Sequence, residues 1–399
     1  MDHKVTTDYT RLLGNANVKV YVRARPCADG QQAPEDMFER KKETPNNIVI
    51  KDTERMQYGN HAFSFDHVYW TDTTQDTLFE QTSKCLVDYA LKGINSCCFA
   101  YGQTGSGKTF SIFGEPGGEK VGLLSRSIEY LFDMIQRQTS NSKEVTLVVS
   151  FLEIYCDRVR DLARAYLKKT GRPSSYQTSS SAEWFLRQQQ PQQQQIPRTE
   201  SATSFSSIPP KAEEDYDYEK ANFEIHEDAQ GRVFVKDLSM ITVSSREEAD
   251  AIVQCGLKLR STHETKMNAV SSRSHTVFTI HVFQRVRDSD EVIYGMLNMV
   301  DLAGYVFDFS AVLAAQFLTK GTLKFRSERL KKSESDGQRL KEALHINSSL
   351  SAVGKVVMSL DPESGYNYIP YRDSKLTRLL QNSIGSFVSG ACLPIKFTF

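Results

Sequence analysis

The chain's clearest chemical signature is the run GQTGSGKT at residues 102–109. It fits the pattern G-x-x-x-x-G-K-[ST], in which backbone N–H groups surround the phosphates of a nucleotide. Glycines are needed because the backbone must curl until successive N–H groups point at one anion. Lys108 would reach the β- and γ-phosphates, and the hydroxyl of Thr109 would ligate Mg²⁺. The residues of this predicted phosphate loop are Gly102, Gln103, Thr104, Gly105, Ser106, Gly107, Lys108 and Thr109.

Two further stretches have the residue types that a nucleotide site needs. Residues 268–275 (NAVSSRSH) gather hydroxyls, an amide and an arginine in one loop, which suits a switch that senses γ-phosphate and Mg²⁺. Residues 296–304 (MLNMVDLAG) form an apolar run that ends in Asp and then Gly, the layout of a Walker-B element. Asp301 would hold Mg²⁺ through water, and the amide of Gly304 would meet the γ-phosphate. Without these stretches, a chance Gly- and Ser-rich turn remains the alternative for residues 102–109.

The surrounding pattern predicts the elements that position this loop. Residues 95–101 form a short buried strand, and a helix opening at Lys108 would aim its positive end at the phosphates. Further strands alternate with helices, which predicts an α/β domain with the phosphate site at the carboxyl edge of its sheet. The strands are expected at residues 18–25, 47–51, 62–69, 145–154, 233–238, 241–243 and 276–284, and the helices at 74–91, 123–136, 245–260 and 374–384.

Composition restricts the class of partner and the compartment. Lys and Arg together number 49, as do Asp and Glu, so a polyanion must be met by a local basic patch. The seven cysteines have no C-x-x-C spacing, which indicates reduced thiols and no zinc or disulfide framework. No apolar run approaches a membrane span, and the charged residues 1–16 are expected to be a flexible lead-in without a signal peptide.

Residues 166–220 interrupt the alternation of strands and helices. They contain a Ser-rich stretch, a Gln tract and an acidic stretch, which together predict a disordered surface insertion. A solvated loop without function is the favoured interpretation, and an interaction or phosphorylation segment is the alternative.

Several stretches, in order along the chain, resemble the kinesin motor domain, and the resemblance covers residues 17–385. It implies a P-loop NTPase fold with a central, mostly parallel mixed sheet flanked by helices on both faces. It also implies an ATPase that uses ATP and Mg²⁺, moves along microtubules and works in the cytoplasm on the cytoskeleton. The matching stretches are residues 18–26, 102–109, 268–275, 301–304, 327–337, 345–352 and 369–378.

The resemblance also assigns roles around the nucleotide. Arg23, Arg25 and Pro26 would pack around adenine, with Phe110 placed to stack on it. The expected metal ligands are Thr109, Ser272 and, through water, Asp301.

A second set of residues would perform the hydrolysis. By resemblance, Ser271 and Ser272 face the γ-phosphate and Mg²⁺, while Asn268 and Arg273 place the attacking water. Glu328 would pair with Arg273 and close the pocket.

Two basic clusters are candidates for the partner surface. Taken alone, such charges are more often a solvated face. The resemblance places these segments against acidic tubulin, so microtubule binding should weaken as salt screens it. Nothing in the chain is typical of nucleic-acid readout. The clusters are Arg329, Lys331, Lys332, Arg339 and Lys341, and then Arg372, Lys375 and Arg378.

Two stretches depart from the family pattern. Residues 305–326 separate Gly304 from Ser327, which are adjacent in the family, and their aromatic and aliphatic residues are unlike a solvated loop. Catalytic groups misplaced by about 1 Å can lose about 10²-fold in rate, so this insertion puts the Arg273–Glu328 pair in doubt. The first hypothesis is a retained intron or gene-model error, and a real, tolerated insertion is the alternative. The transcript sequence distinguishes them.

The second departure is residues 386–399, a tail that does not resemble the family's continuation. The last core strand, last helix, neck linker and coiled coil are therefore expected to be missing, which predicts a truncated, monomeric motor. An ATP-driven microtubule motor is the first hypothesis for function. The alternative is an ATP- and microtubule-binding protein with impaired hydrolysis. A helicase or small GTPase is disfavoured, and no N-K-x-D base-reading motif is present.

Overall fold

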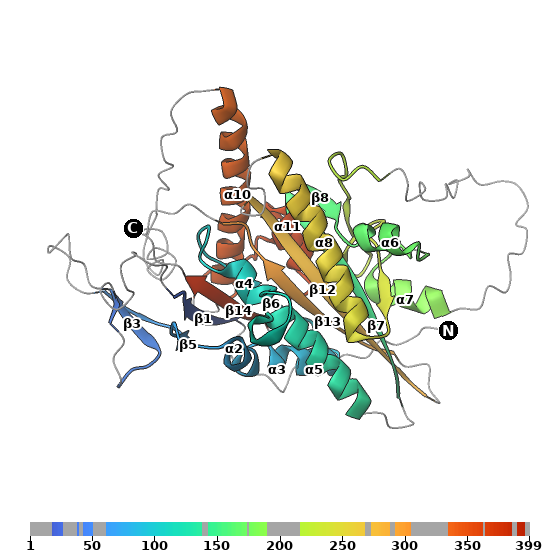
Figure 1. Cartoon of the computed structure of the whole chain (residues 1–399), viewed down its shortest axis with the longest axis horizontal. Coiled ribbons are helices and arrows are strands. Elements are labelled where there is room, and N and C mark those ends of the chain that lie inside the picture. Colours follow the sequence, from blue (N-terminus) through green and yellow to red (C-terminus); the bar gives the residue numbers. More distant parts are fainter. Residues whose placement is uncertain are drawn as a thin grey trace, which may run out of the picture.

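Figure 1 shows the computed structural model of the 399-residue chain. The described residues are 18–26, 38–39, 43–50, 61–137, 143–173, 175–189, 216–267, 273–287, 292–304, 334–361, 364–384 and 389–395. The predicted lead-in 1–16 and the insertion 305–326 lie outside them.

A mixed sheet of nine strands forms the centre of the described part of the chain (Figure 1). Its antiparallel half is built from long strands, whereas its parallel half contains the strand that precedes the phosphate loop. β8 (Arg158–Asp161) pairs with the end of β7. The order is β11 (Ile241–Val243), β7 (Lys143–Tyr155), β12 (Ser274–Val286), β13 (Val292–Asp301), β6 (Ser96–Ala100), β14 (Ser389–Ile395), β1 (Val18–Ala24) and β5 (His67–Tyr69).

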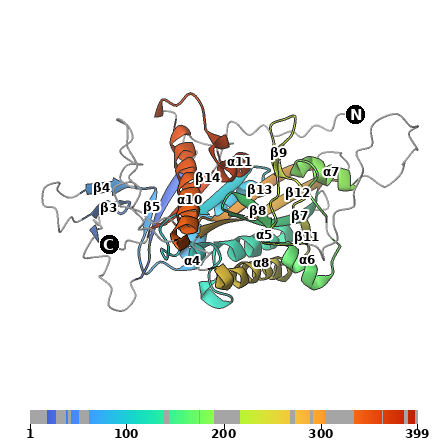
Figure 2. The ribbon, with the colours of Figure 1, turned by 90° about the horizontal axis from the view of Figure 1, so that it is seen from above.

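Helices cover both faces of this sheet, as expected (Figure 2). Side chains alternate along β6, so Cys98 and Ala100 join one apolar core and Cys97 and Phe99 join the other. The second core lies under α10 (Glu334–Ser359) and α11 (Lys375–Leu380). The first core lies under α2 (Gln75–Gln81), α3 (Lys84–Leu91), α4 (Lys108–Ile112), α5 (Leu123–Arg137), α6 (Arg164–Thr170) and α8 (Arg246–Met267). None of the described helices is long and apolar enough to span a bilayer.

Smaller elements complete the fold. β2 (Phe38–Glu39), β3 (Asn47–Ile50) and β4 (His61–Ser64) make a separate sheet, and β9 (Ile225–Glu227) pairs with β10 (Val233–Val235) in a hairpin. The strand predicted at residues 62–69 is therefore two strands, β4 and β5, in different sheets. The helix predicted at residues 74–91 is likewise divided into α2 and α3.

The prediction that the last core strand is missing was wrong. β14 comes from the tail and lies parallel between β1 and β6, with Val18 opposite Ser389 and Cys98 opposite Gly390. Its proline explains why the sequence does not look like a strand, since proline cannot donate to a ladder. Pro394 lies beyond Cys392, the last residue of β14 that pairs with β6.

The predicted disorder of residues 166–220 was wrong for the described parts of that range. α7 (Ser181–Gln189) packs on the sheet through Trp184 and Phe185, both buried. The Phe185 ring stacks on Phe283 of β12, with centroids 4.1 Å apart. The many Ser and Gln residues make the average composition of this range polar, so the few aromatic residues do not stand out. Those aromatic residues supply enough buried apolar area to order the backbone of α7. Residues 190–215 lie outside the described part.

Candidate nucleotide site

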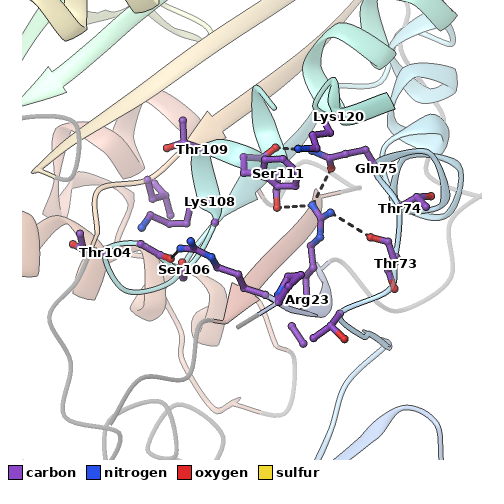
Figure 3. Close-up of a pocket in the computed structure, with 18 of the residues that line it drawn as sticks. Arg23, Thr73, Thr74, Gln75, Thr104, Ser106, Lys108, Thr109, Ser111 and Lys120 are labelled. Atoms are coloured by element: carbon purple, nitrogen blue, oxygen red, sulfur yellow. Dashed lines mark hydrogen bonds between the residues drawn. The ribbon is translucent and has the colours of Figure 1, made fainter. Parts of the chain in front are cut away.

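A cavity of about 750 Å³ opens at the carboxyl end of β6, the edge where the phosphate site was expected (Figure 3). Three segments supply most of its lining: residues 23–26 at the end of β1, residues 71 and 73–75 at the start of α2, and residues 104–111 of the phosphate loop and α4. Glu119, Lys120 and Leu302 complete it. Of the predicted nucleotide-binding residues, Gly102 and Gln103 lie outside the lining, and the others are brought together there. Binding itself stays a prediction.

The loop backbone has the shape that its glycines allow. Gly105 and Gly107 have φ angles of 74° and 100°, in the left-handed region that side chains rarely adopt. α4 then begins at Lys108, directly after Gly107. The predicted helix start is confirmed.

Lys108 is only 6% exposed, and its ammonium donates to the backbone carbonyl of Gln103 at 2.9 Å. Burial lowers its pKa to about 8, although the carboxylate of Asp301 opposes this shift. Arg25 donates to the carbonyl of Gly105. Two cations therefore line the loop.

The Thr109 hydroxyl donates to Asp301 Oδ2 at 2.7 Å and so joins the phosphate loop to the end of β13. Asp301 is 1% exposed, and its Oδ1 has no hydrogen-bond partner among the described residues. A buried carboxylate oxygen without a partner is costly unless a water or cation satisfies it. A hydroxyl and a carboxylate are also ligands that Mg²⁺ accepts. These residues therefore fit the predicted metal site.

Arg23 is part of the cavity wall. It is 8% exposed and donates to Gln75 Oε1 and Ser111 Oγ, both at 2.9 Å (Figure 3). Its guanidinium carbon lies 5.3 Å from the centroid of the Phe110 ring. Arg23 therefore braces β1 against α2 and α4, while Arg25 and Pro26 remain exposed at the mouth. Gln75 and Ser111 were missed because nothing in the sequence pairs them with Arg23.

Most of the predicted hydrolytic residues cannot be compared with the structure. Asn268, Ser271, Ser272 and Glu328 lie outside the described residues, so their roles stay predictions. Arg273 is half-buried at the edge of a second cavity of about 190 Å³, which is bordered by the turn after β7 and by α10 and α11.

Gly304 packs directly on the phosphate loop. A Cβ added there would lie 2.2 Å from Thr104 Oγ1 and 2.8 Å from Thr104 Cα. No side chain fits without moving the loop, which explains why the run ends in glycine.

His275 connects three elements, a role that was not predicted from the sequence. The Ala303 N–H donates to Nδ1 at 2.9 Å, so Nε2 carries the proton and donates to Ser349 Oγ at 2.7 Å. Burial lowers the His275 pKa to about 3, with help from Arg260 and Lys108, so the ring is neutral. It ties β12 to the segment after β13 and to α10.

The second basic cluster is gathered around α11, and Glu227 of β9 partly neutralises it. Arg372 lies 3.0 Å and Arg378 4.0 Å from Glu227 Oε2. Lys375 donates to Asn222 Oδ1 at 3.3 Å. Arg329, Lys331 and Lys332 lie outside the described residues, as do the side chains of Arg339 and Lys341, whose backbone belongs to α10.

The family model described as "Kinesin motor domain" matches residues 23–306 and 326–391. Among curated relatives, the Arabidopsis thaliana kinesin-like protein KIN-14M is 31% identical over 92% of this chain and 41% of its own length. Kinesin-like protein KIN-14O, also from Arabidopsis thaliana, is 32% identical over 96% of this chain and 27% of its own length. The chain thus spans less than half of each of these relatives.

Solved structures agree with this match. The structure of a fast kinesin, solved for its implications for ATPase mechanism and interactions with microtubules, has a TM-score of 0.66 and 28% identity. That comparison covers 95% of this chain and 85% of the other. The motor domain of the Saccharomyces cerevisiae kinesin-related protein Kar3 has a TM-score of 0.65 and 26% identity, covering 96% and 93%.

Proposed function

Because the chain belongs to the kinesin motor domain family, we propose that it binds MgATP in the phosphate-loop cavity and couples ATP hydrolysis to movement along microtubules. The contact between Thr109 and Asp301 carries the proposal. It joins the two sequence elements that must hold one metal ion. In addition, Asp301 Oδ1 has no hydrogen-bond partner among the described residues, so a metal-bound water could satisfy it.

The residues divide the work by position. The loop N–H groups and Lys108 bind the phosphates, and Thr109, Ser272 and, through water, Asp301 would hold Mg²⁺. Mg²⁺ bound there would neutralise charge that develops on the β- and γ-phosphates during transfer. Asn268 and Arg273 orient the attacking water, and Glu328 orients Arg273.

The proposed motor domain covers residues 17–385 together with β14, which fills the sheet between β1 and β6. The proposed filament surface includes Arg372, Lys375 and Arg378 around α11. Tubulin is acidic, so this surface attracts it over the 8–10 Å range that physiological salt allows. We place the protein in the cytoplasm, on the cytoskeleton.

A second function is favoured by one observation. The family match omits residues 307–325 and resumes at 326, just before Glu328. Gly304, three residues before this gap, packs on Thr104 of the phosphate loop. An insertion there displaces Glu328 from Arg273 if its ends lie apart. The protein would then bind ATP and microtubules but hydrolyse slowly.

Steady-state ATP turnover and co-sedimentation with microtubules distinguish the two functions. Turnover that microtubules stimulate is expected of the motor. Nucleotide-dependent sedimentation without turnover is expected of the binder. A chain that shows neither turnover nor nucleotide-dependent sedimentation would contradict both proposals. For the motor, Arg273→Ala should retain nucleotide binding and lose nearly all hydrolysis, whereas full activity in this variant would contradict its role.

A further inference from the structure

Glu153, near the carboxyl end of β7, is a fully buried carboxylate that the proposed reaction does not use. Its Oε2 accepts a hydrogen bond from the Tyr218 hydroxyl and lies 3.4 Å from Arg160 Nη1. Its Oε1 lies 3.5 Å from Arg260 Nε. Three different elements therefore converge on this one side chain: β8, α8 and the segment before β9.

From Arg260 the chain of contacts continues to the nucleotide site. Arg260 Nη1 lies 3.5 Å from Asp301 Oδ2, and Ser274 holds the same guanidinium through its hydroxyl and carbonyl at 3.2 and 3.1 Å. Asp301 in turn accepts from Thr109. A chain of polar contacts thus runs from Tyr218 through Glu153, Arg260 and Asp301, all buried, to Thr109, which is exposed at the nucleotide site.

Each charge in this chain depends on its neighbours. Glu153 and Asp301 face Arg160 and Arg260, so two carboxylates are balanced by two guanidinium groups, all less than a tenth exposed. Water cannot screen such charges, and a buried charge that loses its partner is strongly destabilised. A displaced Glu153 therefore pulls Arg260 with it and changes the field at Asp301.

Tyr218 is the member of this chain of contacts that is farthest from Thr109, and it contacts both Glu153 and Arg160. Its ring lies 4.7 Å from the Arg160 guanidinium, which also lies 4.9 Å from the Tyr155 ring. Burial and the neighbouring Glu153 raise the pKa of its hydroxyl well above the usual range, so it keeps its proton and donates. Tyr218 lies in the described stretch that begins at residue 216.

We propose that Tyr218 is a positioning residue for the nucleotide site, because it fixes Glu153 and thereby sets Arg260 and Asp301 beside Thr109. This inference rests on the proposed MgATP binding. It means that the segment around residues 216–223, adjoining the Ser- and Gln-rich stretch, sets the Mg²⁺ dependence of nucleotide binding.

The test compares Tyr218→Phe with a matched control, Tyr216→Phe. Tyr216 is half-buried, and its hydroxyl accepts from the backbone N–H of Asp161 and donates to the carbonyl of Asp161 rather than to Glu153. The measurement is the equilibrium affinity of the full chain for fluorescent ADP over a range of Mg²⁺ concentrations. Tyr218→Phe should need about 10-fold more Mg²⁺ for tight binding, the lower end of the effect of residues that support metal ligands. Tyr216→Phe should match the wild type.

A second variant separates positioning from a general loss of stability. Glu153→Gln should raise the Mg²⁺ requirement on its own, and Tyr218→Phe should then add little, because both changes act through one side chain. Additive effects, or wild-type Mg²⁺ dependence in Tyr218→Phe, would overturn the inference while leaving MgATP binding intact. A wild-type chain that binds no nucleotide at any Mg²⁺ concentration would overturn the proposed function and this inference with it.

Discussion

At the residue scale, the charge that Lys108 needs for phosphate binding is opposed by its burial. Lys108 must be charged to bind phosphate, yet its burial lowers its pKa from 10.5 to about 8. Below pH 8 the amine is protonated and attracts the triphosphate, and above pH 8 it progressively loses that charge in the free protein. The dissociation constant for ATP should therefore rise by up to about 10-fold per pH unit above pH 8. Titration with a fluorescent ATP analogue between pH 7 and pH 9.5 measures it.

The control for this pH dependence is Lys108→Ala. It should bind ATP much more weakly, and its affinity should be nearly constant over the same pH range because the titrating group is gone. Unchanged affinity in Lys108→Ala would contradict the role of the phosphate loop. A pH dependence equal to that of the wild type would assign the titration to another group.

The sequence predicted those site residues that lie together in one motif. Residues 104–109 are consecutive, so their types alone indicate phosphate binding. Other contacts in the site join residues from distant positions in the sequence. Gln75 and Ser111 accept hydrogen bonds from Arg23, and Arg260 of α8 lies beside Asp301. Such pairs exist only once the sheet brings the elements together. No local pattern could therefore have predicted them.

At the scale of elements, α7 shows how few aromatic residues are needed to order a polar stretch. Phe185→Ala should destabilise the protein by about 3–5 kcal/mol, because it removes a buried ring that stacks on Phe283. Urea denaturation followed by circular dichroism measures the change. Phe185→Leu, which keeps most of the apolar volume, should cost clearly less. A loss below about 1 kcal/mol in Phe185→Ala would mean that α7 does not pack on the sheet in solution.

Elements with a strong period were predicted well, and those that depend on their neighbours were not. β12 and α5 have long alternating or helical patterns and were found within a few residues of their bounds. β14 contains Gly390 and Pro394, which disfavour a strand in isolation. Its extended conformation depends on pairing with β1 on one side and β6 on the other.

At the scale of the whole molecule, β14 joins the two parts of the parallel half of the sheet. A chain that stops at residue 385 leaves β1 and β6 without their shared neighbour and opens two sheet edges. This shortened chain should lose its cooperative thermal transition and become sensitive to protease. A chain that stops at residue 395 should behave like the full chain. Equal stability of the two shortened chains would contradict the pairing of β14.

The position of β14 also has a consequence for how the protein is made. At about 5–20 residues per second, a ribosome adds β14 some 15 to 60 s after β6, its partner in the sheet. Contacts between such distant parts of a sequence form slowly and leave apolar strand edges open meanwhile. A nascent chain therefore has its complete phosphate loop long before the sheet can support it. Chaperones that protect strand edges should matter more to its folding than to that of a protein whose sheet closes early.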